Sequence, residues 1–192
     1  MIKPILFSAS MVQAILRGEK TVTRRLISSQ HLRVLESPYH RENPDVEDAT
    51  LLAKLCLPPY SAGDMLYVRE AWAVAYDVAG FPGGVAMAGA PQYVYRADGP
   101  DGLKWRPSIH MPKAAARIWL RVTAVQPARL HDMTEADVRR EGFGNPGDFI
   151  RLWDSTLRPE ARASAGWCAN PWVWVISFER LTDGEIGELV LT

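Results

Sequence analysis

The sequence predicts an α+β fold in which short helices surround a small, barrel-like β-sheet. Hydrophobic and polar side chains alternate along residues 117–126 and again along 172–178, with the period of two that half-buried strands show. A third strand signal is the short apolar run at residues 2–7. Helical spacing occurs in short stretches between these segments, and this mixture is typical of α+β proteins with long loop insertions.

The first part of the chain divides into a strand, a helix and a second extended segment. After the apolar run at 2–7, Ser10 is placed to cap a helix whose hydrophobic residues share one face. Gly18 stands where a left-handed glycine ends such a helix, and residues 21–27 carry the β-branched and arginine side chains of an extended segment. Residues 28–60 contain four prolines and little periodicity, so we expect a partly irregular insertion there.

The remaining elements follow from the same signals. Residues 65–69 predict a strand, and the glycine-rich segment 77–102 predicts a long loop that a strand-like stretch at 92–96 interrupts. Short helices are expected at 133–141 and 148–156. The spacing of these elements does not define their topology.

The length of 192 residues suits one domain. We therefore expect a single domain over residues 1–180, with loop-rich insertions at 28–60 and 77–102. Residues 181–192 are expected to form a C-terminal tail. The sequence leaves the oligomeric state open.

The charges of the chain cancel, with 22 basic against 22 acidic residues. Net charge therefore provides no general attraction for nucleic acid, and any such binding requires a local basic patch. The 17 arginines far outnumber the five lysines. Guanidinium groups suit bidentate recognition of phosphate or base edges, so the composition is compatible with a nucleotide ligand.

Neither a metal nor another cofactor is expected. Cys56 and Cys168 are far apart in the sequence, and the four histidines lack metal-binding spacing. No apolar run approaches the roughly 18 residues of a membrane span, and the first residues lack the layout of a signal peptide. We therefore expect a cytoplasmic protein with no membrane partner.

Residues 18–25 hold the densest group of reactive side chains. Three basic residues, Lys20, Arg24 and Arg25, surround the hydroxyls of Thr21 and Thr23 where a helix gives way to a strand. On a straight strand Lys20 and Thr23 would point to opposite faces, so they converge only if Lys20 belongs to the preceding turn. The alternative is a solvated turn before an edge strand, because charge clusters usually lie at the surface.

Several motifs in a fixed order resemble those of ASCH domains, a branch of the PUA-like superfamily. The resemblance is to the ASCH domains that phages and prophages carry. The motifs are KPILFS at 3–8, GxKxxTRR at 18–25, GDxxYVRExW at 63–72, YRAD at 95–98, WRPSIHMP at 105–112 and NPWVWV at 170–175. The resemblance covers most of residues 1–180 and is weaker over 28–55, 77–92 and 156–166. It implies a small β-barrel with peripheral helices and a cleft for RNA or nucleosides.

Some smaller ASCH proteins are amidohydrolases that remove the acetyl group from N4-acetylcytidine, and the resemblance extends to their catalytic residues. By that resemblance Lys20, Thr23 and Glu141 are the catalytic residues of this chain. Amide hydrolysis needs a nucleophile, a base and a proton donor to the leaving nitrogen. A lysine acts as a base only when neutral, and both burial and the charges of Arg24 and Arg25 lower its pKa.

Five further residues are expected to bind the substrate: Arg24, Arg25, Glu70, Trp72 and Trp105. The arginines would bind phosphate or a base edge, and Trp72 or Trp105 would stack on a nucleobase. Glu70 would be a second carboxylate in the cleft or a partner for Arg69. For most of the seven tryptophans, core packing is the competing interpretation.

The sequence thus leads to one hypothesis and two alternatives. The hypothesis is a cofactor-free amidohydrolase that acts on N4-acylated cytidine or a related modified nucleoside. The alternatives are a non-catalytic PUA-like module that binds RNA or a modified nucleotide, and a ribonuclease. A binding module needs no neutral lysine beside a carboxylate, so the joint presence of Lys20, Thr23 and Glu141 favours the enzyme.

Overall fold

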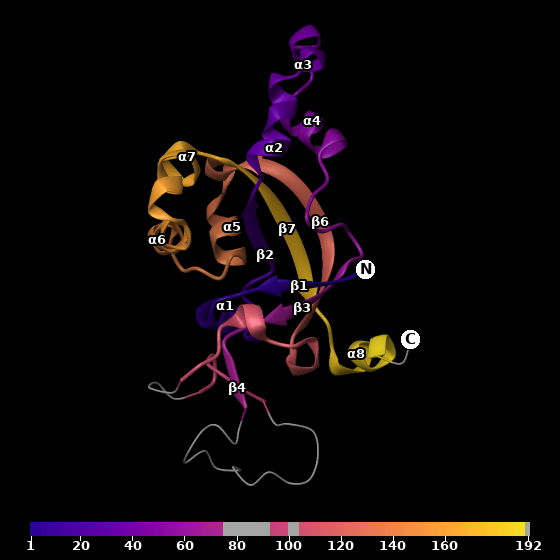
Figure 1. The fold of residues 1–192 in the computed structure, drawn as a ribbon, viewed down its shortest axis with the longest axis vertical. Coiled ribbons are helices and arrows are strands. Elements are labelled where there is room, and N and C mark those ends of the chain that lie inside the picture. Colours follow the sequence, from indigo (N-terminus) through magenta and orange to yellow (C-terminus); the bar gives the residue numbers. More distant parts are fainter. Residues whose placement is uncertain (75–92, 100–103, 191–192) are drawn as a thin grey trace. The chain divides into compact units, whose positions relative to one another are not determined.

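The fold is mixed α+β, as the sequence predicts (Figure 1). The computed structural model describes residues 1–74, 93–99 and 104–190. A five-stranded sheet has the order β1-β3-β6-β7-β2, and β4 and β5 form a separate two-stranded sheet. Among the described residues the larger sheet begins at β1 and ends at β2, so it is open where the sequence predicts a barrel.

The chain divides into two compact units. Unit 1 comprises Met1–Gly18, Met65–Arg121 and Arg180–Thr192, and unit 2 comprises Glu19–Asp64 and Val122–Glu179. Strand β6 (Trp119–Arg129) begins in unit 1 and continues in unit 2. The chain therefore crosses between the units several times, an organisation that local sequence patterns cannot reveal.

Unit 1 is built on three strands. β1 (Ile2–Leu6) lies parallel to β3 (Met65–Arg69), with Ile2 opposite Met65. β3 runs antiparallel to the start of β6, with Met65 opposite Arg121. Alternating residues of these strands are buried, as half-buried strands require: Ile5, Leu66, Val68 and Leu120.

Helix α1 (Ala9–Leu16) follows β1, and its start corrects the prediction of a cap at Ser10. Ser8 is the N-cap instead, because its backbone is extended and its carbonyl accepts the first helical hydrogen bond, from Val12 N at 2.9 Å. The helix ends as expected at Gly18, whose φ of 75° lies in the left-handed region that favours glycine.

The small sheet of unit 1 consists of β4 (Trp72–Val74) and β5 (Tyr93–Tyr95), which run antiparallel with Trp72 opposite Tyr95. β5 confirms the strand-like stretch expected at 92–96, whereas most of the loop expected at 77–102 lies outside the described residues. Two 3-10 turns follow, η3 (Ser108–His110) and η4 (Lys113–Ala115).

Residues 183–190 form a helix, α8 (Asp183–Val190), where the sequence predicts a tail. Two contacts explain it. Glu185 accepts hydrogen bonds from the Thr182 backbone N–H at 2.8 Å and hydroxyl at 2.9 Å, and it pairs with Arg121 at 2.9 Å. Leu181, immediately before the helix, is buried. The capping contacts of Glu185 and the buried Leu181 side chain therefore order a segment that has no clear helical pattern of apolar residues.

Unit 2 pairs β2 (Val22–Leu26) antiparallel with β7 (Trp172–Arg180), with Val22 opposite Ser177 and Leu26 opposite Val173. Three helices lie beside these strands (Figure 1): α5 (Glu135–Arg140), α6 (Pro146–Thr156) and α7 (Arg162–Ala165). Short 3-10 turns connect them: η5 (Leu130–Asp132), η6 (Pro159–Ala161) and η7 (Trp167–Ala169).

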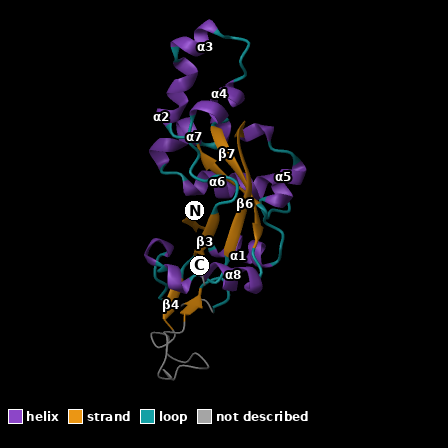
Figure 2. Cartoon of the chain, turned by 90° about the vertical axis from the view of Figure 1, so that its right-hand side faces the viewer, coloured by secondary structure: helices purple, strands orange, loops and turns teal. Residues whose placement is uncertain are grey.

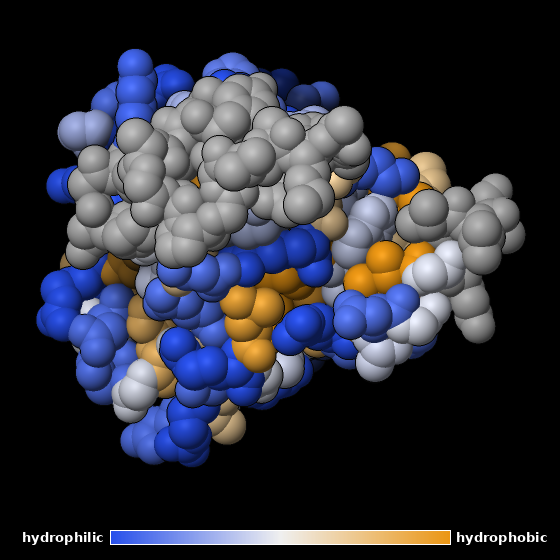
Figure 3. Space-filling model, turned by 90° about the horizontal axis from the view of Figure 1, so that it is seen from below, coloured by the Kyte–Doolittle hydropathy of each residue, from blue (hydrophilic) through white to orange (hydrophobic). Residues whose placement is uncertain are grey.

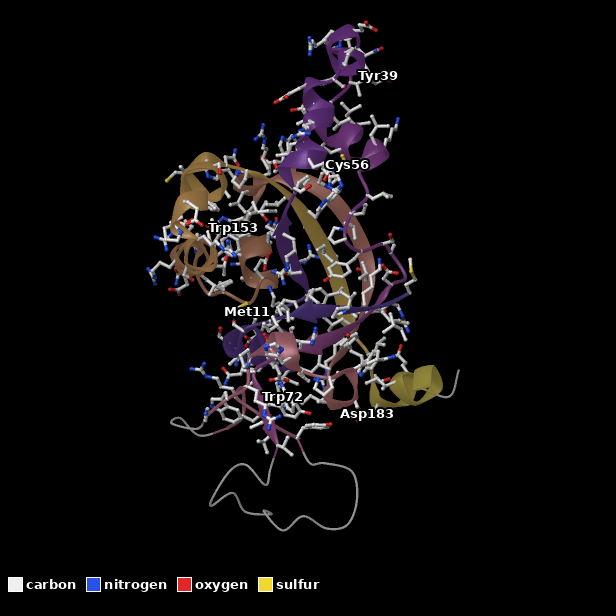
Figure 4. All side chains as sticks on the ribbon, in the orientation of Figure 1. Met11, Tyr39, Cys56, Trp72, Trp153 and Asp183 are labelled. Carbon is white, nitrogen blue, oxygen red and sulfur yellow. The ribbon has the colours of Figure 1, made fainter. Side chains whose placement is uncertain are left out.

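The core of unit 2 lies between strands and helices. Its buried members are Val22, Leu130, Phe149, Trp153, Val173 and Val175. Trp153, labelled in Figure 4, also donates its indole N–H to the carbonyl of Ala165 at 2.9 Å. This core holds α6 and the α7 segment in place, and it fixes the position of β2.

Residues 28–60 are largely helical, which differs from the partly irregular insertion that the sequence predicts. They form α2 (Ser29–Leu32), η1 (Arg33–Glu36), α3 (Pro38–Glu42) and α4 (Asp48–Leu55), which gather beyond one end of β7 (Figures 1 and 2). Each element is too short to show a clear period. Ser28 and Ser37 cap two of them by accepting from His31 N and His40 N. No described helix has the length and apolar character needed to cross a membrane.

Candidate functional site

The backbone of unit 2 brings Lys20 and Glu141 together although 121 residues separate them. Lys20 lies between Gly18 and β2, and it forms an isolated antiparallel bridge with Glu141. The neighbouring Thr21 N–H donates to the Arg140 carbonyl at 2.8 Å, which extends this pairing. Lys20 thus belongs to the connection before the strand, which is the condition for its predicted convergence with Thr23.

Helix α5 positions Glu141 through its two ends. Thr134 is the N-cap, and its side chain and that of Asp137 form a capping box. Glu141 is the C-cap residue, and Gly142 follows with a φ of 90°. The helix therefore begins and ends at defined residues, as the sequence predicts, and the Glu141 carboxylate stands at the negative end of the helix dipole.

The Lys20 amine is buried and donates to three oxygens. It contacts Glu141 Oε2 at 2.5 Å, the Val22 carbonyl at 2.8 Å and the Glu141 carbonyl at 3.0 Å. The two side chains are 1% and 4% exposed. Three acceptors match the three protons of an ammonium group, so the arrangement holds a charged lysine against a carboxylate.

Arg24 binds the other oxygen of the same carboxylate. Its Nη1 lies 3.1 Å from Glu141 Oε1, and its Nη2 lies 3.7 Å from Asp137 Oδ2. The Nε atom of Arg24 is buried and has no hydrogen-bond partner among the described residues. Glu141 therefore bridges two buried cations, and Asp137 adds a second carboxylate that sequence reasoning missed. The spacing Thr134-x-x-Asp137, a capping-box signature, was the available signal.

Thr23 and Arg25 occupy the face of β2 opposite to Val22 and Arg24, because neighbouring strand residues alternate. Thr23 is buried and lies opposite Ile176, and Arg25 is half-buried and lies opposite Trp174. Arg25 Nη1 donates to the Arg24 carbonyl at 3.4 Å. The three described hydrogen bonds of the Lys20 amine go to Val22 and Glu141, so the role of Thr23 stays a prediction.

The surroundings lower the pKa of the Lys20 amine below its ordinary value. Burial is the main cause, the charges of Arg25 and Arg24 act in the same direction, and Glu141 opposes them. Burial also lowers the pKa of Arg25. Burial alone would raise the pKa of Asp137, but hydrogen bonds from Thr134 and the charges of Arg24 and Arg140 lower it overall.

Glu70, one of the expected substrate-binding residues, belongs to unit 1 and is engaged by an arginine. Its carboxylate is buried and accepts from Arg117 Nε at 2.9 Å and Nη2 at 3.1 Å. Arg117 also pairs with Asp98. Burial raises the pKa of Glu70, although the Arg117 hydrogen bonds and charge act against this. Arg117, rather than Arg69, is thus the described partner of Glu70.

The two tryptophans expected to stack on a base also belong to unit 1. Trp72 is only 6% exposed and packs in a cluster with Val74, Met111 and Ala115. The Tyr93 ring meets it edge-on at 5.6 Å, and its indole N–H has no acceptor among the described residues. Trp105 is half-buried. A shared site with Lys20 stays a prediction for Glu70, Trp72 and Trp105.

Within the described part of the chain, no group of three or more histidine, cysteine or acidic residues could hold a metal ion. Cys56 is buried, and its thiol donates to the His31 carbonyl at 3.5 Å. The candidate site in unit 2 consists of Lys20, Arg24, Asp137 and Glu141, with Thr23 and Arg25 on the opposite face of β2 from Arg24.

Comparison with known proteins gives structural likeness alone. No family model and no curated protein matches the sequence. The fold is similar to an ASCH domain from Lactobacillus crispatus JV V101, with a TM-score of 0.46 and 14% identity, over 93% of this chain and 79% of that one. It is also similar to a hypothetical protein, PH0355, with a TM-score of 0.43 and 10% identity, over 94% of this chain and all of the other. Likeness of this degree carries no inference about activity.

Proposed function

We propose that this chain is a cofactor-free amidohydrolase that removes the acyl group from N4-acylated cytidine or a related modified nucleoside. The observation that carries the proposal is the buried pair of Lys20 and Glu141, whose polar atoms lie 2.5 Å apart. A lysine with a lowered pKa, in hydrogen-bond contact with a carboxylate, can pass a proton to it and then act as a base.

The proposed reaction begins with that transfer. Glu141 takes a proton from the Lys20 ammonium, and the neutral amine keeps two N–H donors and gains a lone pair. One of its three hydrogen-bond directions is thereby released, and rotation about the Cε–Nζ bond aims the lone pair at an incoming hydroxyl. Thr23, three residues further along the chain, is buried and is the proposed source of that hydroxyl.

Thr23 Oγ1 then attacks the acyl carbonyl carbon while Lys20 accepts the hydroxyl proton. The carbon–N4 bond breaks, Glu141 returns its proton to the leaving nitrogen, and the acyl group remains as an ester on Thr23. Lys20 then passes its proton to Glu141 again and accepts a proton from the water that attacks the ester. Glu141 returns its proton to the threonine oxygen as the ester bond breaks, which restores the threonine and releases the acid. The sum is one acylated nucleoside and one water converted to one nucleoside, one carboxylate and one proton.

The charges of the site also suit recognition of a polar substrate. Lys20, Arg24 and Arg25 outnumber the two acidic side chains, Asp137 and Glu141. The surplus positive charge would stabilise the oxyanion that forms when the carbonyl is attacked. The same surplus is compatible with the alternative of a non-catalytic module that binds a nucleotide.

The experiment is incubation of the purified protein with a panel of N4-acylated cytidines, with chromatography used to detect released cytidine. The proposal predicts release by the wild-type protein and by a Thr21→Val control, which loses a hydroxyl two residues from Thr23. It predicts none from Thr23→Val, which removes the proposed nucleophile at nearly the same shape. Binding of cytidine derivatives without any cleavage would contradict the amidohydrolase hypothesis and support the non-catalytic binding module.

A further inference from the structure

One guanidinium group joins two carboxylates of helix α5. Arg24 lies on β2, and its Nη1 is 3.1 Å from Glu141 Oε1 while its Nη2 is 3.7 Å from Asp137 Oδ2. Asp137 and Glu141 are four residues apart, so their side chains lie one turn apart on the same face of the helix. The terminal nitrogens of a guanidinium keep fixed positions in one plane. Arg24 therefore relates the two carboxylates to each other and to β2.

These charges are unusual because they are withdrawn from water. Hydrophilic residues surround smaller hydrophobic groups on the face drawn in Figure 3, as is usual for a protein surface. The side chains of Arg24 and Glu141, in contrast, are each 4% exposed, and that of Asp137 is 23% exposed. Burying charges costs free energy that their pairing only partly offsets, and hydrophobic residues of similar volume often stabilise a fold equally well. Stability alone therefore explains this arrangement poorly.

Asp137 is itself held by the first turn of α5. Its Oδ2 accepts from the Thr134 backbone N–H at 3.1 Å and from the Thr134 hydroxyl at 2.9 Å. Its Oδ1 lies 3.6 Å from Arg140 Nη1. Asp137 thus has a fixed position near the start of the helix, and its ion pair with Arg24 aligns the guanidinium with the Glu141 carboxylate at the helix end.

The two oxygens of the Glu141 carboxylate face different donors. Oε2 is 2.5 Å from Lys20 Nζ, and Oε1 is 3.1 Å from Arg24 Nη1. An ammonium group is a compact charge that does not define the plane of a carboxylate, and the terminal torsion of a glutamate is broad, whereas a planar guanidinium does define that plane. Arg24 also has donors only and stays protonated. A proton on Oε1 would therefore face another N–H, and Oε2 is the oxygen that remains for it.

We infer that Arg24, held by Asp137, is a positioning residue that fixes the Glu141 carboxylate so that Oε2 alone exchanges a proton with Lys20. The inference rests on the hydrolysis proposed for Lys20, Thr23 and Glu141. In that reaction one proton leaves Lys20 Nζ, binds Oε2 and then passes to the leaving nitrogen, while Arg24 and Asp137 neither gain nor lose one. Neither residue needs to contact the substrate, so this role differs from the phosphate or base contact that the sequence predicts for Arg24.

Steady-state hydrolysis of N4-acetylcytidine separates positioning from substrate binding. Arg24→Lys keeps the charge but cannot bridge two carboxylates, so kcat should fall about 10–100-fold while KM stays at the wild-type value. If Arg24→Lys does not fold, Arg24→Gln, which is planar but donates from one nitrogen only, should show the same loss. A raised KM with unchanged kcat would assign Arg24 to substrate binding and overturn the inference.

A double-mutant cycle tests whether Asp137 acts through Arg24. Asp137→Asn keeps a side-chain oxygen for Thr134 and removes the charge that faces Arg24, so kcat should fall roughly three- to tenfold. In the Arg24→Lys background the same change should have no further effect, whereas independent effects would multiply. The matched control Glu135→Gln removes an exposed carboxylate from the first turn of α5 and should leave kcat and KM unchanged. Multiplied losses, or an equal loss in the control, would overturn the inference.

A measurement on the protein without substrate keeps this inference distinct from the proposed activity. In nitrogen NMR spectra the two terminal nitrogens of Arg24, assigned by their loss in the Arg24 variant, should give separate signals, because the two carboxylates hinder rotation about the Nε–Cζ bond. Asp137→Asn should average these signals, and Glu135→Gln should not. Averaged signals in the wild-type protein would refute the fixed geometry even if the protein cleaves N4-acetylcytidine. Separate signals without any cleavage would support the fixed geometry and refute the hydrolysis.

Discussion

Replacing Glu141 should destabilise the protein more than replacing Lys20 does. In Glu141→Gln, two buried cations, Lys20 and Arg24, lose the carboxylate that lies 2.5 and 3.1 Å from them. Removing one partner of a buried ion pair costs about 3–5 kcal/mol, because the remaining charge is uncompensated. For a chain of this size that corresponds to a melting temperature roughly 6–20 °C lower.

Lys20→Met removes a buried charge and leaves Glu141 paired with Arg24. Its main cost is the loss of donors to two carbonyl oxygens, Val22 O and Glu141 O, and amounts to about 1–3 kcal/mol. Urea unfolding at pH 7, followed by the fluorescence of the seven tryptophans, would measure both variants. A Glu141→Gln protein that is as stable as wild type, or more stable than Lys20→Met, would refute the idea that Glu141 compensates the two cations.

Three further predictions follow from the same contacts. Glu141→Gln should slow cleavage of an N4-acylcytidine by about 10²–10⁴-fold, because it removes the proton carrier. Thr23→Ser should retain part of the activity, because the oxygen remains. Steady-state assays of the folded variants measure both effects. The folded protein lowers the pKa of Lys20, so the unfolded chain binds more protons at pH values just below the ordinary lysine pKa of 10.5. Wild type should therefore gain stability relative to Lys20→Met as pH rises toward that value. Urea midpoints of the two proteins compared between about pH 8 and 10 test this, and a constant difference contradicts it.

The sequence predicted the elements whose patterns are local and strong. β1, β3 and β7 follow from an apolar run and from alternation, and α5 follows from its capping residues. The helix-rich segment at 28–60 and helix α8 were missed, because their order comes from serine and threonine caps and a few buried leucines. Closure of the sheet was a wrong expectation, since period-two patterns specify strands but not the edges at which a sheet ends.

The candidate site was predictable only in part. Side-chain spacing identified the cluster around Lys20, but nothing local connects it with Glu141, which the resemblance to ASCH domains supplied. The bridge by Arg24 and the second carboxylate at Asp137 depend on how α5 packs beside β2, and a sequence does not show that packing. Trp72 shows the reverse: the sequence predicted that Trp72 or Trp105 stacks on a nucleobase, and the structure buries Trp72.

Lys20→Arg tests the base role of Lys20 most directly. Arginine keeps the positive charge and can still bind Glu141, but it stays protonated because its pKa is above about 12. The measurement is a time course of cytidine release from N4-acetylcytidine by wild-type and Lys20→Arg proteins, with circular dichroism confirming that both are folded. The account predicts release by the wild-type protein and none by Lys20→Arg. Substantial release by the folded Lys20→Arg protein would contradict it.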